Sequence, residues 1–280
     1  MTTGRDLPRP RTAAGVAGLA AIRADPSGAL VAVDFDGTLA PIVDDPATSR
    51  VQPGGIEALT AIRRSGARVA VITGRAAVVA VRLGGLQAVP GIVVLGQYGA
   101  ERWHDGELTT PDPLPGLAAV RSGLSTVMAD AEHGAWVEDK RLSLVVHTRP
   151  CTDPDAALRR LAPRIAALAD ANGLEADSGR YVVEIRPPGI DKGRALRALV
   201  GELRARAVLF AGDDVGDLPA FDVVEQLRGR GTAGVTVCSA STEVAAVAER
   251  ADVVVGGTRG VVDFLEALGS AMSGEDAVTR

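Results

Sequence analysis

Short apolar runs alternate with longer amphipathic segments along most of the chain. Unbroken runs of Val, Ala, Leu and Ile are typical of strands that are buried on both faces of a parallel sheet. We expect such strands at residues 30–33, 69–72, 92–95, 208–211, 234–237 and 252–255. Segments with helical spacing separate these runs. The alternation predicts an α/β fold with a doubly wound, mostly parallel core sheet.

The pattern changes between about residues 102 and 187. An Asp105-Gly106 pair between two short segments indicates a hairpin. The remainder reads as one helix followed by two strands, twice over. The helices are expected at 114–131 and 154–171, and the strands at 135–138, 142–147, 174–177 and 181–185. Such a repeat predicts an antiparallel sheet with helices on one face. We therefore divide the chain into a core of residues 1–101 and 188–280 and an inserted α+β cap domain at 102–187.

Two aspartates follow the first apolar run directly. Residues 29–42 read ALVAVDFDGTLAPI, so Asp34 and Asp36 stand at the carboxyl end of the expected strand. Ligands of parallel sheets bind just beyond this end. Two carboxylates one residue apart concentrate negative charge, which a hard cation such as Mg²⁺ would offset. The structural alternative is a strand that ends in a polar turn, since Asp and Gly are ordinary turn residues.

Three further polar motifs follow expected strands or begin a helix. They are Thr73-Gly74-Arg75, Asp191-Lys192-Gly193 and Gly212-Asp213-Asp214. Convergence at one sheet edge suits phosphoryl transfer, because that chemistry depends on positioning and charge neutralisation. Each motif also has a structural alternative: Thr73 can cap a helix, Lys192 can be a solvated surface lysine, and Asp217 can stabilise a helix N-terminus.

Composition narrows the function classes. The chain has 280 residues, of which 46% are hydrophobic and 23% charged. A net charge of −5, the lack of a Lys/Arg-rich run and an aromatic content of 3% argue against nucleic-acid binding. No apolar stretch is long enough for a membrane span, and the N-terminal segment does not resemble a signal peptide. Cys151 and Cys238 form no CxxC pair, so neither a disulfide framework nor a zinc site is indicated. We expect a cytoplasmic protein.

The four motifs DFDGT, TGR, DKG and GDDVGD resemble, in this order, those of the haloacid dehalogenase superfamily of phosphatases and phosphotransferases. The resemblance implies that Asp34 is the nucleophile that accepts the phosphoryl group and that Asp36 is the general acid and base. It also implies that Thr73, Lys192 and the backbone N–H groups of residues 35–38 hold the phosphoryl oxygens.

The resemblance further implies Mg²⁺ as the cofactor. The candidate metal ligands are Asp34, Asp36 through its main-chain carbonyl, Asp213 and Asp214. Asp214 and Asp217 can instead stand behind the ligands, where they would orient a metal-bound water or Lys192.

Longer segments are similar to the trehalose-6-phosphate phosphatases. The similar segments are LVAVDFDGTLAPIVDDP, TGR, GQYGAERW, VEDKRLSLVVHTR, YVVEIRPPGIDKG and GDDVGDLPAF, which run through most of residues 29–225. An insertion between TGR and DKG is that superfamily's larger kind of cap, which usually closes over small phosphorylated metabolites. By this resemblance we expect a monomer that acts on a small molecule, trehalose 6-phosphate, and binds neither nucleic acid nor membranes.

The resemblance assigns substrate contacts in both domains. They are Gly37, Gly74 and Arg75 in the core and Glu138, Lys140, Arg149 and Glu184 in the cap. Glu138 and Lys140 lie two apart on one expected strand and therefore share a face. His147 is a weaker candidate. The structural alternative for the cap residues is a solvated sheet face with cross-strand ion pairs.

The sequence departs from the family pattern at two places. Gln97-Tyr98 stands where the family usually has Asn-His or Asn-Tyr, and Gly216 stands where it usually has Thr. Neither change touches Asp34, so we expect activity to be retained. The alternatives are another sugar-phosphate phosphatase, a phosphomannomutase-like phosphotransferase, or a non-catalytic sugar-phosphate-binding regulator. The intact catalytic motifs argue against the last.

Overall fold

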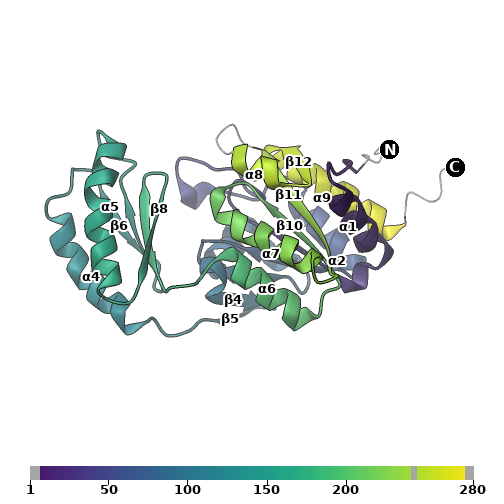
Figure 1. Cartoon of the computed structure of the whole chain (residues 1–280), viewed down its shortest axis with the longest axis horizontal. Coiled ribbons are helices and arrows are strands. Elements are labelled where there is room, and N and C mark those ends of the chain that lie inside the picture. Colours follow the sequence, from purple (N-terminus) through teal and green to yellow (C-terminus); the bar gives the residue numbers. More distant parts are fainter. Residues whose placement is uncertain (1–6, 241–244, 275–280) are drawn as a thin grey trace. The chain divides into compact units, whose positions relative to one another are not determined.

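The computed structural model describes residues 7–240 and 245–274, which form two compact units (Figure 1). The cap unit is Thr110–Ile190, and the core unit is formed by the described residues on either side of it. The cap therefore begins and ends a few residues later than the expected 102–187. The first boundary differs because the hairpin around Asp105-Gly106 extends the core sheet and does not belong to the cap.

The core unit is built on an eight-stranded sheet with the order β12-β11-β10-β1-β2-β3-β4-β5. The parallel strands are β1 Ala29–Val33, β2 Arg68–Ile72, β3 Val93–Gly96, β10 Ala207–Gly212, β11 Ala233–Ala240 and β12 Val253–Gly256. The antiparallel hairpin is β4 Glu101–His104 and β5 Glu107–Thr109. From β1 the chain continues to β2 and β3 on one side, and later to β10, β11 and β12 on the other. The topological switch point therefore lies between β1 and β10, which is where ligands of such sheets bind.

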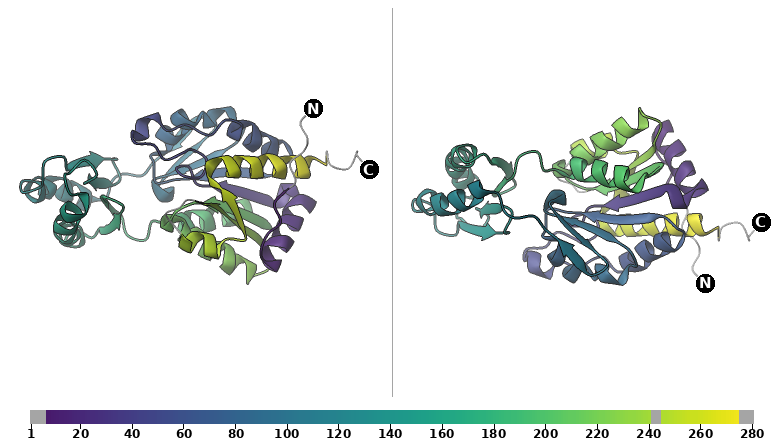
Figure 2. Two further views of the ribbon diagram at one scale, coloured as in Figure 1. Left: turned by 90° about the horizontal axis from the view of Figure 1, so that it is seen from above. Right: turned by 90° about the horizontal axis from the view of Figure 1, so that it is seen from below.

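Helices cover both faces of the core sheet, so the expected doubly wound fold is confirmed. One face packs against α1 Ala13–Ala24, α2 Gly55–Arg64, α3 Ala77–Gly84 and α9 Gly257–Ser273. The other face packs against α6 Lys192–Leu203, α7 Leu218–Arg228 and α8 Ala245–Arg250. In the left view of Figure 2, α9 (yellow) lies along the sheet. None of the helices in the described part of the chain is long and apolar enough to cross a bilayer.

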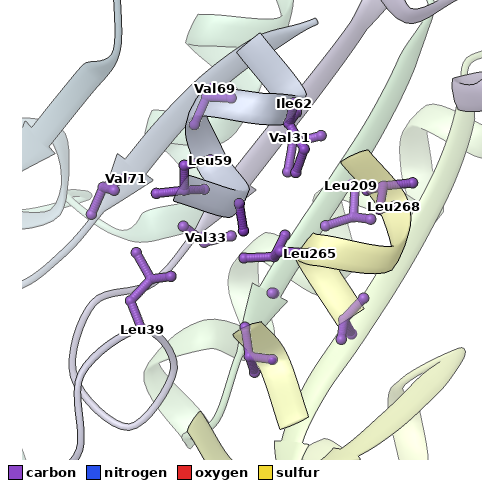
Figure 3. Packing of buried hydrophobic residues seen from close by; sticks show 14 of the residues in the cluster. Val31, Val33, Leu39, Leu59, Ile62, Val69, Val71, Leu209, Leu265 and Leu268 are labelled. Atoms are coloured by element: carbon purple, nitrogen blue, oxygen red, sulfur yellow. The ribbon is translucent and has the colours of Figure 1, made fainter. Parts of the chain in front are cut away.

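Strand β1 is apolar throughout because each of its faces meets a helix layer. All five of its residues are buried. Val31 and Val33 point toward Leu59 of α2 and Leu265 of α9, as Figure 3 shows, while Leu30 and Ala32 join the opposite cluster. Full burial of one Val or Leu side chain contributes roughly 1.5–3 kcal/mol. This packing fixes the strand end from which Asp34 projects.

The cap unit contains a four-stranded antiparallel sheet with the order β6-β7-β9-β8. Its elements are α4 Pro115–Met128, β6 Trp136–Asp139, β7 Leu144–His147, α5 Pro154–Asp170, β8 Glu175–Gly179 and β9 Val182–Arg186. Leu144, Val146, Val183 and Ile185 pack against the two helices in an aliphatic core. Glu138, Val145 and Glu184 are paired across β6, β7 and β9 and lie on the opposite face. The expected helix–strand–strand repeat is confirmed.

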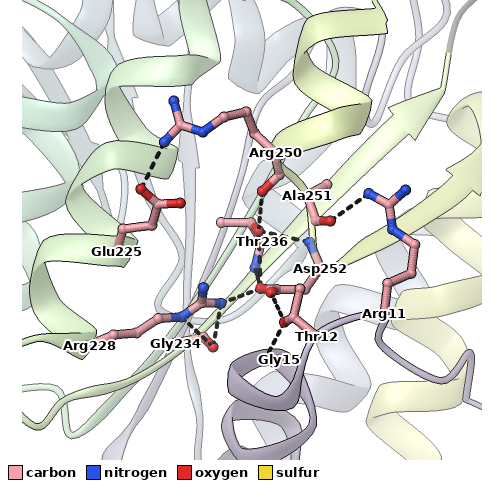
Figure 4. Close-up of polar contacts among 10 residues, drawn as sticks. All are labelled: Arg11, Thr12, Gly15, Glu225, Arg228, Gly234, Thr236, Arg250, Ala251 and Asp252. Atoms are coloured by element: carbon pink, nitrogen blue, oxygen red, sulfur yellow. Dashed lines mark hydrogen bonds and ion pairs between the residues drawn. The ribbon is translucent and has the colours of Figure 1, made fainter.

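A buried carboxylate connects the start of α1 to the C-terminal half of the core sheet (Figure 4). Asp252 is 1% exposed. Its Oδ2 accepts hydrogen bonds from the Thr236 N–H (2.7 Å) and hydroxyl (3.0 Å), and it pairs with Arg228. The Thr12 hydroxyl donates to Asp252 Oδ1 and accepts from the Gly15 N–H at 2.9 Å, which caps α1. The network therefore depends on the negative charge of the Asp252 carboxylate.

We expect Asp252→Ala to lower the free energy of unfolding by about 3–5 kcal/mol, because the Thr236 N–H loses its acceptor and Arg228 loses its charged partner and keeps only the Gly234 carbonyl. Urea unfolding followed by circular dichroism measures the change. Asp222→Ala is the matched control, since Asp222 pairs with Arg250 at the surface. Loss of an exposed pair should cost about 1 kcal/mol or less. Equal losses in the two variants would contradict the role given to Asp252.

Candidate active site

The two carboxylates central to the site come from adjacent strands at the switch point. Asp34 directly follows β1, and Asp213 directly follows β10. The strands are in register there, since Val33 pairs with Ala211 and the Asp34 N–H donates to the Ala211 carbonyl at 2.8 Å. Asp34, Asp213 and Asp217 each offer a carboxylate oxygen within 4.8 Å of the others. Asp34 therefore forms one acidic cluster with two residues that lie about 180 positions later in the chain.

Lys192 enters this cluster from the start of α6. Asp191 caps the helix as expected, since its Oδ1 accepts the Arg194 N–H at 2.7 Å. Lys192 is the first residue of the helix and is 5% exposed. Its Nζ donates to Asp34 Oδ1 and to Asp217 Oδ1, both at 2.7 Å. It is thus a buried member of the site and not a solvated surface lysine.

Asp217 supports both Lys192 and the loop that carries Asp213. One oxygen of Asp217 holds the lysine, and the other accepts the N–H groups of Asp213 (2.9 Å) and Asp214 (3.2 Å). Its side chain is fully buried. These contacts are the ones expected of a residue that orients Lys192. Asp214 is exposed and lies outside the acidic group of the described residues.

Negative charge exceeds positive charge in this cluster, because Asp34, Asp213 and Asp217 surround the single ammonium of Lys192. Burial raises the pKa of Asp34 well above its usual range, although Lys192 opposes the shift. Burial, together with the charges of Asp217 and Asp214, raises the pKa of Asp213 to about 7. Burial alone would lower the pKa of Lys192, but the neighbouring carboxylates, led by Asp217 and Asp34, raise it overall.

The donors of this cluster fit a hard divalent cation. They are carboxylate oxygens, and the described residues around them include no histidine. A bound cation would replace the protons that the raised carboxyl pKa values otherwise retain. Asp34 and Asp213 are the carboxylates best placed to hold it, since both oxygens of Asp217 are already engaged.

The carboxylate of Asp36 lies apart from the acidic cluster. Arg75 binds it through two hydrogen bonds, Nε to Oδ2 at 2.6 Å and Nη2 to Oδ1 at 2.7 Å. Arg75 also donates to the Pro46 carbonyl at 2.8 Å, and its guanidinium lies 5.5 Å from the centre of the Phe35 ring. The family resemblance implied that Arg75 lies beside the phosphate and did not indicate its pairing with Asp36. Asp36 would therefore reach a metal only through its main-chain carbonyl.

The loop after β1 passes so close to Asp213 that only glycine fits at position 37. Its φ is +76°, and a Cβ at this position would lie 2.0 Å from Asp213 Oδ2. Thr38 donates to Asp213 Oδ1 at 3.1 Å, and Ser239 donates to the Gly37 carbonyl at 2.7 Å. Sequence reasoning did not single out Ser239, because it lies near the end of β11 without a recognisable motif. These contacts hold the loop after β1 against the end of β10.

Backbone hydrogen bonds from Gln97 and Tyr98, where the sequence departs from the family pattern, hold the TGR motif in place. Thr73 is buried, and its Oγ1 accepts the Arg75 N–H at 3.1 Å, so its hydroxyl hydrogen remains available to donate. The N–H groups of Gln97 and Tyr98 donate to the carbonyls of Arg75 (2.8 Å) and Thr73 (2.9 Å). A Cβ at Gly74 would lie 2.8 Å from the Tyr98 hydroxyl. Gln97 and Tyr98 both have positive φ, at 46° and 57°, which is costly for residues other than glycine.

Gly216, the second departure, lies beside Asp214. A Cβ at this position would stand 3.1 Å from Asp214 Oδ1. A threonine would therefore crowd the Asp214 carboxylate, and glycine leaves that space open.

Of the cap residues named from the sequence, Glu138, Lys140 and Glu184 form polar pairs within the cap unit, whereas Arg149 lies against Tyr181. Glu138 Oε2 lies 3.0 Å from His147 Nε2, and Lys140 Nζ lies 3.3 Å from Glu184 Oε1. Ser143, which the sequence did not indicate, donates to the same Glu184 oxygen at 3.0 Å. The Arg149 guanidinium lies 5.6 Å from the centre of the Tyr181 ring. The ion pairs of the structural alternative are thus present.

Comparisons with known proteins agree with this architecture. A crystal structure of a trehalose-6-phosphate phosphatase related protein superposes with a TM-score of 0.69 at 23% identity and covers 89% of this chain and 99% of that one. The C-terminal domain of the trehalose-6-phosphate phosphatase of C. albicans gives a TM-score of 0.76 at 18% identity, covering 95% and 99%. At these identities the likeness shows the fold.

Sequence comparisons show the family. The trehalose-phosphate phosphatase of Mycobacterium avium (strain 104) is 37% identical over 224 residues, which cover 73% of this chain. The chain spans about half the length of this curated relative, 52%. The family profile described as trehalose-phosphatase matches residues 32–254, which include all four core motifs and the cap. The chain therefore belongs to the trehalose-phosphatase family.

Proposed function

We propose that this protein hydrolyses trehalose 6-phosphate to trehalose and inorganic phosphate through an aspartyl-phosphate intermediate. The observation that carries the proposal is the contact of Lys192 with Asp34 at the end of β1, beside Asp213 and Asp217. A buried carboxylate with an adjacent ammonium suits attack on an anionic phosphate, since the ammonium offsets the charge of the phosphoryl oxygens.

In the first step Asp34 attacks the phosphorus atom, and the bond from phosphorus to the sugar oxygen breaks. Asp36 donates its proton to the departing oxygen, so trehalose leaves as a neutral alcohol. Lys192 and the Thr73 hydroxyl donate hydrogen bonds to the phosphoryl oxygens. Arg75, which donates to both carboxylate oxygens of Asp36, fixes the direction of that carboxylate.

In the second step a water molecule attacks the phosphorus of the aspartyl-phosphate. Asp36 accepts a proton from this water, and the bond from phosphorus to Asp34 breaks. Inorganic phosphate leaves, and both carboxylates return to their starting states. The two displacements share one site, which replaces one difficult reaction by two easier ones.

Mg²⁺ is the proposed cofactor, with Asp34, the Asp36 main-chain carbonyl and Asp213 as ligands and Asp214 as a further candidate. When bound, it would neutralise charge between the carboxylates and the phosphate and so permit the approach of two anions. Asp217 would keep Lys192 and the Asp213 loop in place. In the cap, Glu138, Lys140, Arg149 and Glu184 would bind the sugar hydroxyls.

Phosphate release from a panel of phosphorylated mono- and disaccharides, assayed with Mg²⁺, tests the proposal. We expect the highest kcat/KM for trehalose 6-phosphate, loss of turnover in excess EDTA and recovery with Mg²⁺, because the ligands are oxygen atoms suited to a hard cation. Zn²⁺ should substitute poorly. Full activity after EDTA treatment and dialysis would exclude the metal. A higher kcat/KM for a monosaccharide phosphate would exclude trehalose 6-phosphate as the preferred substrate. Transfer of the phosphoryl group without release of inorganic phosphate would indicate a phosphotransferase.

A further inference from the structure

Trp136 and His147 form a stacked pair at the edge of the cap sheet. Their ring centres lie 4.2 Å apart, and the planes differ by 7°. Trp136 is the first residue of β6, the edge strand of this sheet, and it is paired directly with His147 of β7. Trp136 is nevertheless 47% exposed. Since His147 covers one face of the ring, the other face and the edges are the parts of the indole that are open to contact.

The stacked pair adjoins Glu138 on the same face of the sheet. Trp136 and Glu138 lie two apart on β6, so their side chains point to the same side. His147 Nε2 lies 3.0 Å from Glu138 Oε2 and is the donor of this hydrogen bond, because an ionised carboxylate only accepts. His147 thus orients Glu138 through a ring nitrogen and supports Trp136 through a ring face. An exposed aromatic face and an acceptor are held side by side.

Packing of the cap does not account for this position of Trp136. The cap unit contains two aromatic residues, Trp136 and Tyr181, and neither belongs to its apolar core, which is aliphatic. Among the large apolar side chains that are strongly exposed in the described part of the chain, Trp136 is the one aromatic residue. A half-exposed indole leaves apolar surface in water, which is unfavourable unless a ligand or partner covers it.

We propose that Trp136, supported by His147, is a sugar-stacking platform that contributes to the selection of a disaccharide over a small phosphate ester. The inference rests on the proposed sugar-phosphatase function and adds a specificity residue to it. A pyranose ring is amphipathic: its C–H faces are apolar, whereas its hydroxyls are polar. An indole face can cover the C–H face while Glu138 accepts a hydroxyl hydrogen.

Kinetics of Trp136→Ala test the platform. We expect kcat/KM for trehalose 6-phosphate to fall about tenfold, mainly through a higher KM, because a stacking contact of this type supplies binding that does not depend on the chemical step. Hydrolysis of p-nitrophenyl phosphate should change less than about twofold. Trp136→Phe should restore much of the loss. Val137→Ala, at the next position of the strand and on the opposite face, is the matched control. It should leave kcat/KM unchanged for both substrates.

Fluorescence supplies a readout that a structural role of Trp136 would not move. The chain has two tryptophans, so Trp103→Phe leaves Trp136 as the only one. In the Trp103→Phe/Asp34→Asn protein, trehalose 6-phosphate should bind without turnover and give a saturable change in emission. Inorganic phosphate, which has no sugar ring, should give none. Binding of trehalose 6-phosphate and binding of inorganic phosphate are each verified independently by a rise of the melting temperature.

Two results would overturn the inference. One is an unchanged Trp136 emission at a trehalose 6-phosphate concentration that raises the melting temperature. The other is an equal loss of activity toward both substrates in Trp136→Ala, which would make the residue structural. If the wild-type protein prefers another phosphorylated sugar, the proposed substrate is wrong, and the same comparison with the preferred sugar still decides whether Trp136 contacts it.

Discussion

Asp34→Asn should reduce turnover of trehalose 6-phosphate by about four orders of magnitude or more, because the amide retains the shape of the carboxylate but cannot act as its nucleophile. The measurement is phosphate release under saturating substrate and Mg²⁺. A labelled phosphoryl group from the substrate should be trapped on the wild-type protein after acid quench and should be absent from the variant. Asp36→Asn should also be severely impaired but should retain some labelling with a good leaving group.

The same substitution should not destabilise the metal-free protein. Burial raises the pKa of Asp34 well above the value of an unfolded aspartate, 3.8. Between these two pKa values folding takes up a proton, so stability falls as the pH rises. Near neutral pH the wild-type protein is therefore less stable because Asp34 is buried, and the Asn variant, which has no carboxyl group at this position, does not lose stability in this way. The melting temperature of Asp34→Asn in EDTA should therefore equal or exceed that of the wild type, and Mg²⁺ should raise it less. Substantial turnover in this folded variant would rule out the aspartyl-phosphate mechanism.

The architecture of the core was predictable because local pattern and global burial agree there. A strand covered on both faces must be apolar throughout, so β1 and β10 are visible as uninterrupted runs. The cap boundary was less predictable, since the residues of β4 and β5 favour a hairpin in either domain. Their pairing with β3 decides the matter, and such pairing is a long-range contact that the local sequence does not contain.

The motifs predicted which residues gather at this edge of the core sheet, but they did not predict the contacts between these residues. Lys192 alone carries no signal, and it becomes recognisable only with the motifs that surround it. The binding of Arg75 to Asp36 depends on the relative placement of two loops that are 39 residues apart. Ser239 has no motif at all, because its contribution is one hydroxyl that fixes the Gly37 carbonyl. Only the fold brings these groups together.

The polar face of the cap sheet shows a similar limit. The sequence predicted that Glu138 and Lys140 lie on one strand and share a face. In the structure β6 ends at Asp139, one residue before Lys140, and the strand register places Glu138 and Glu184 on one face. The sequence did not give the partner of each residue. Lys140 is paired with Glu184, whereas Glu138 is paired with His147. Substitutions that test the sugar-binding role must therefore be compared with the loss of an ordinary ion pair.

Glu184→Gln and Lys140→Met should each lower kcat/KM for trehalose 6-phosphate by roughly one to three orders of magnitude, at about 1.4 kcal/mol per tenfold. Binding energy from the sugar, remote from the phosphorus, holds the phosphate in position for attack, so its loss can lower kcat as well as raise KM. Hydrolysis of p-nitrophenyl phosphate, which has no sugar hydroxyls, should change little. Parallel assays of both substrates on each variant measure the selectivity.

Asp177→Asn provides the matched control for these cap variants. Asp177 is paired directly with Glu184 across β8 and β9 and so lies on the same face, and its ion pair is with Arg186. Asp177 is 57% exposed and has no assigned contact with the sugar, so its substitution should leave the activity toward both substrates within about twofold. If Asp177→Asn matched the losses of Glu184→Gln, general damage to the sheet would explain them. If all three variants retained the wild-type selectivity, this face would not bind the sugar, and trehalose 6-phosphate would have to be recognised by other residues.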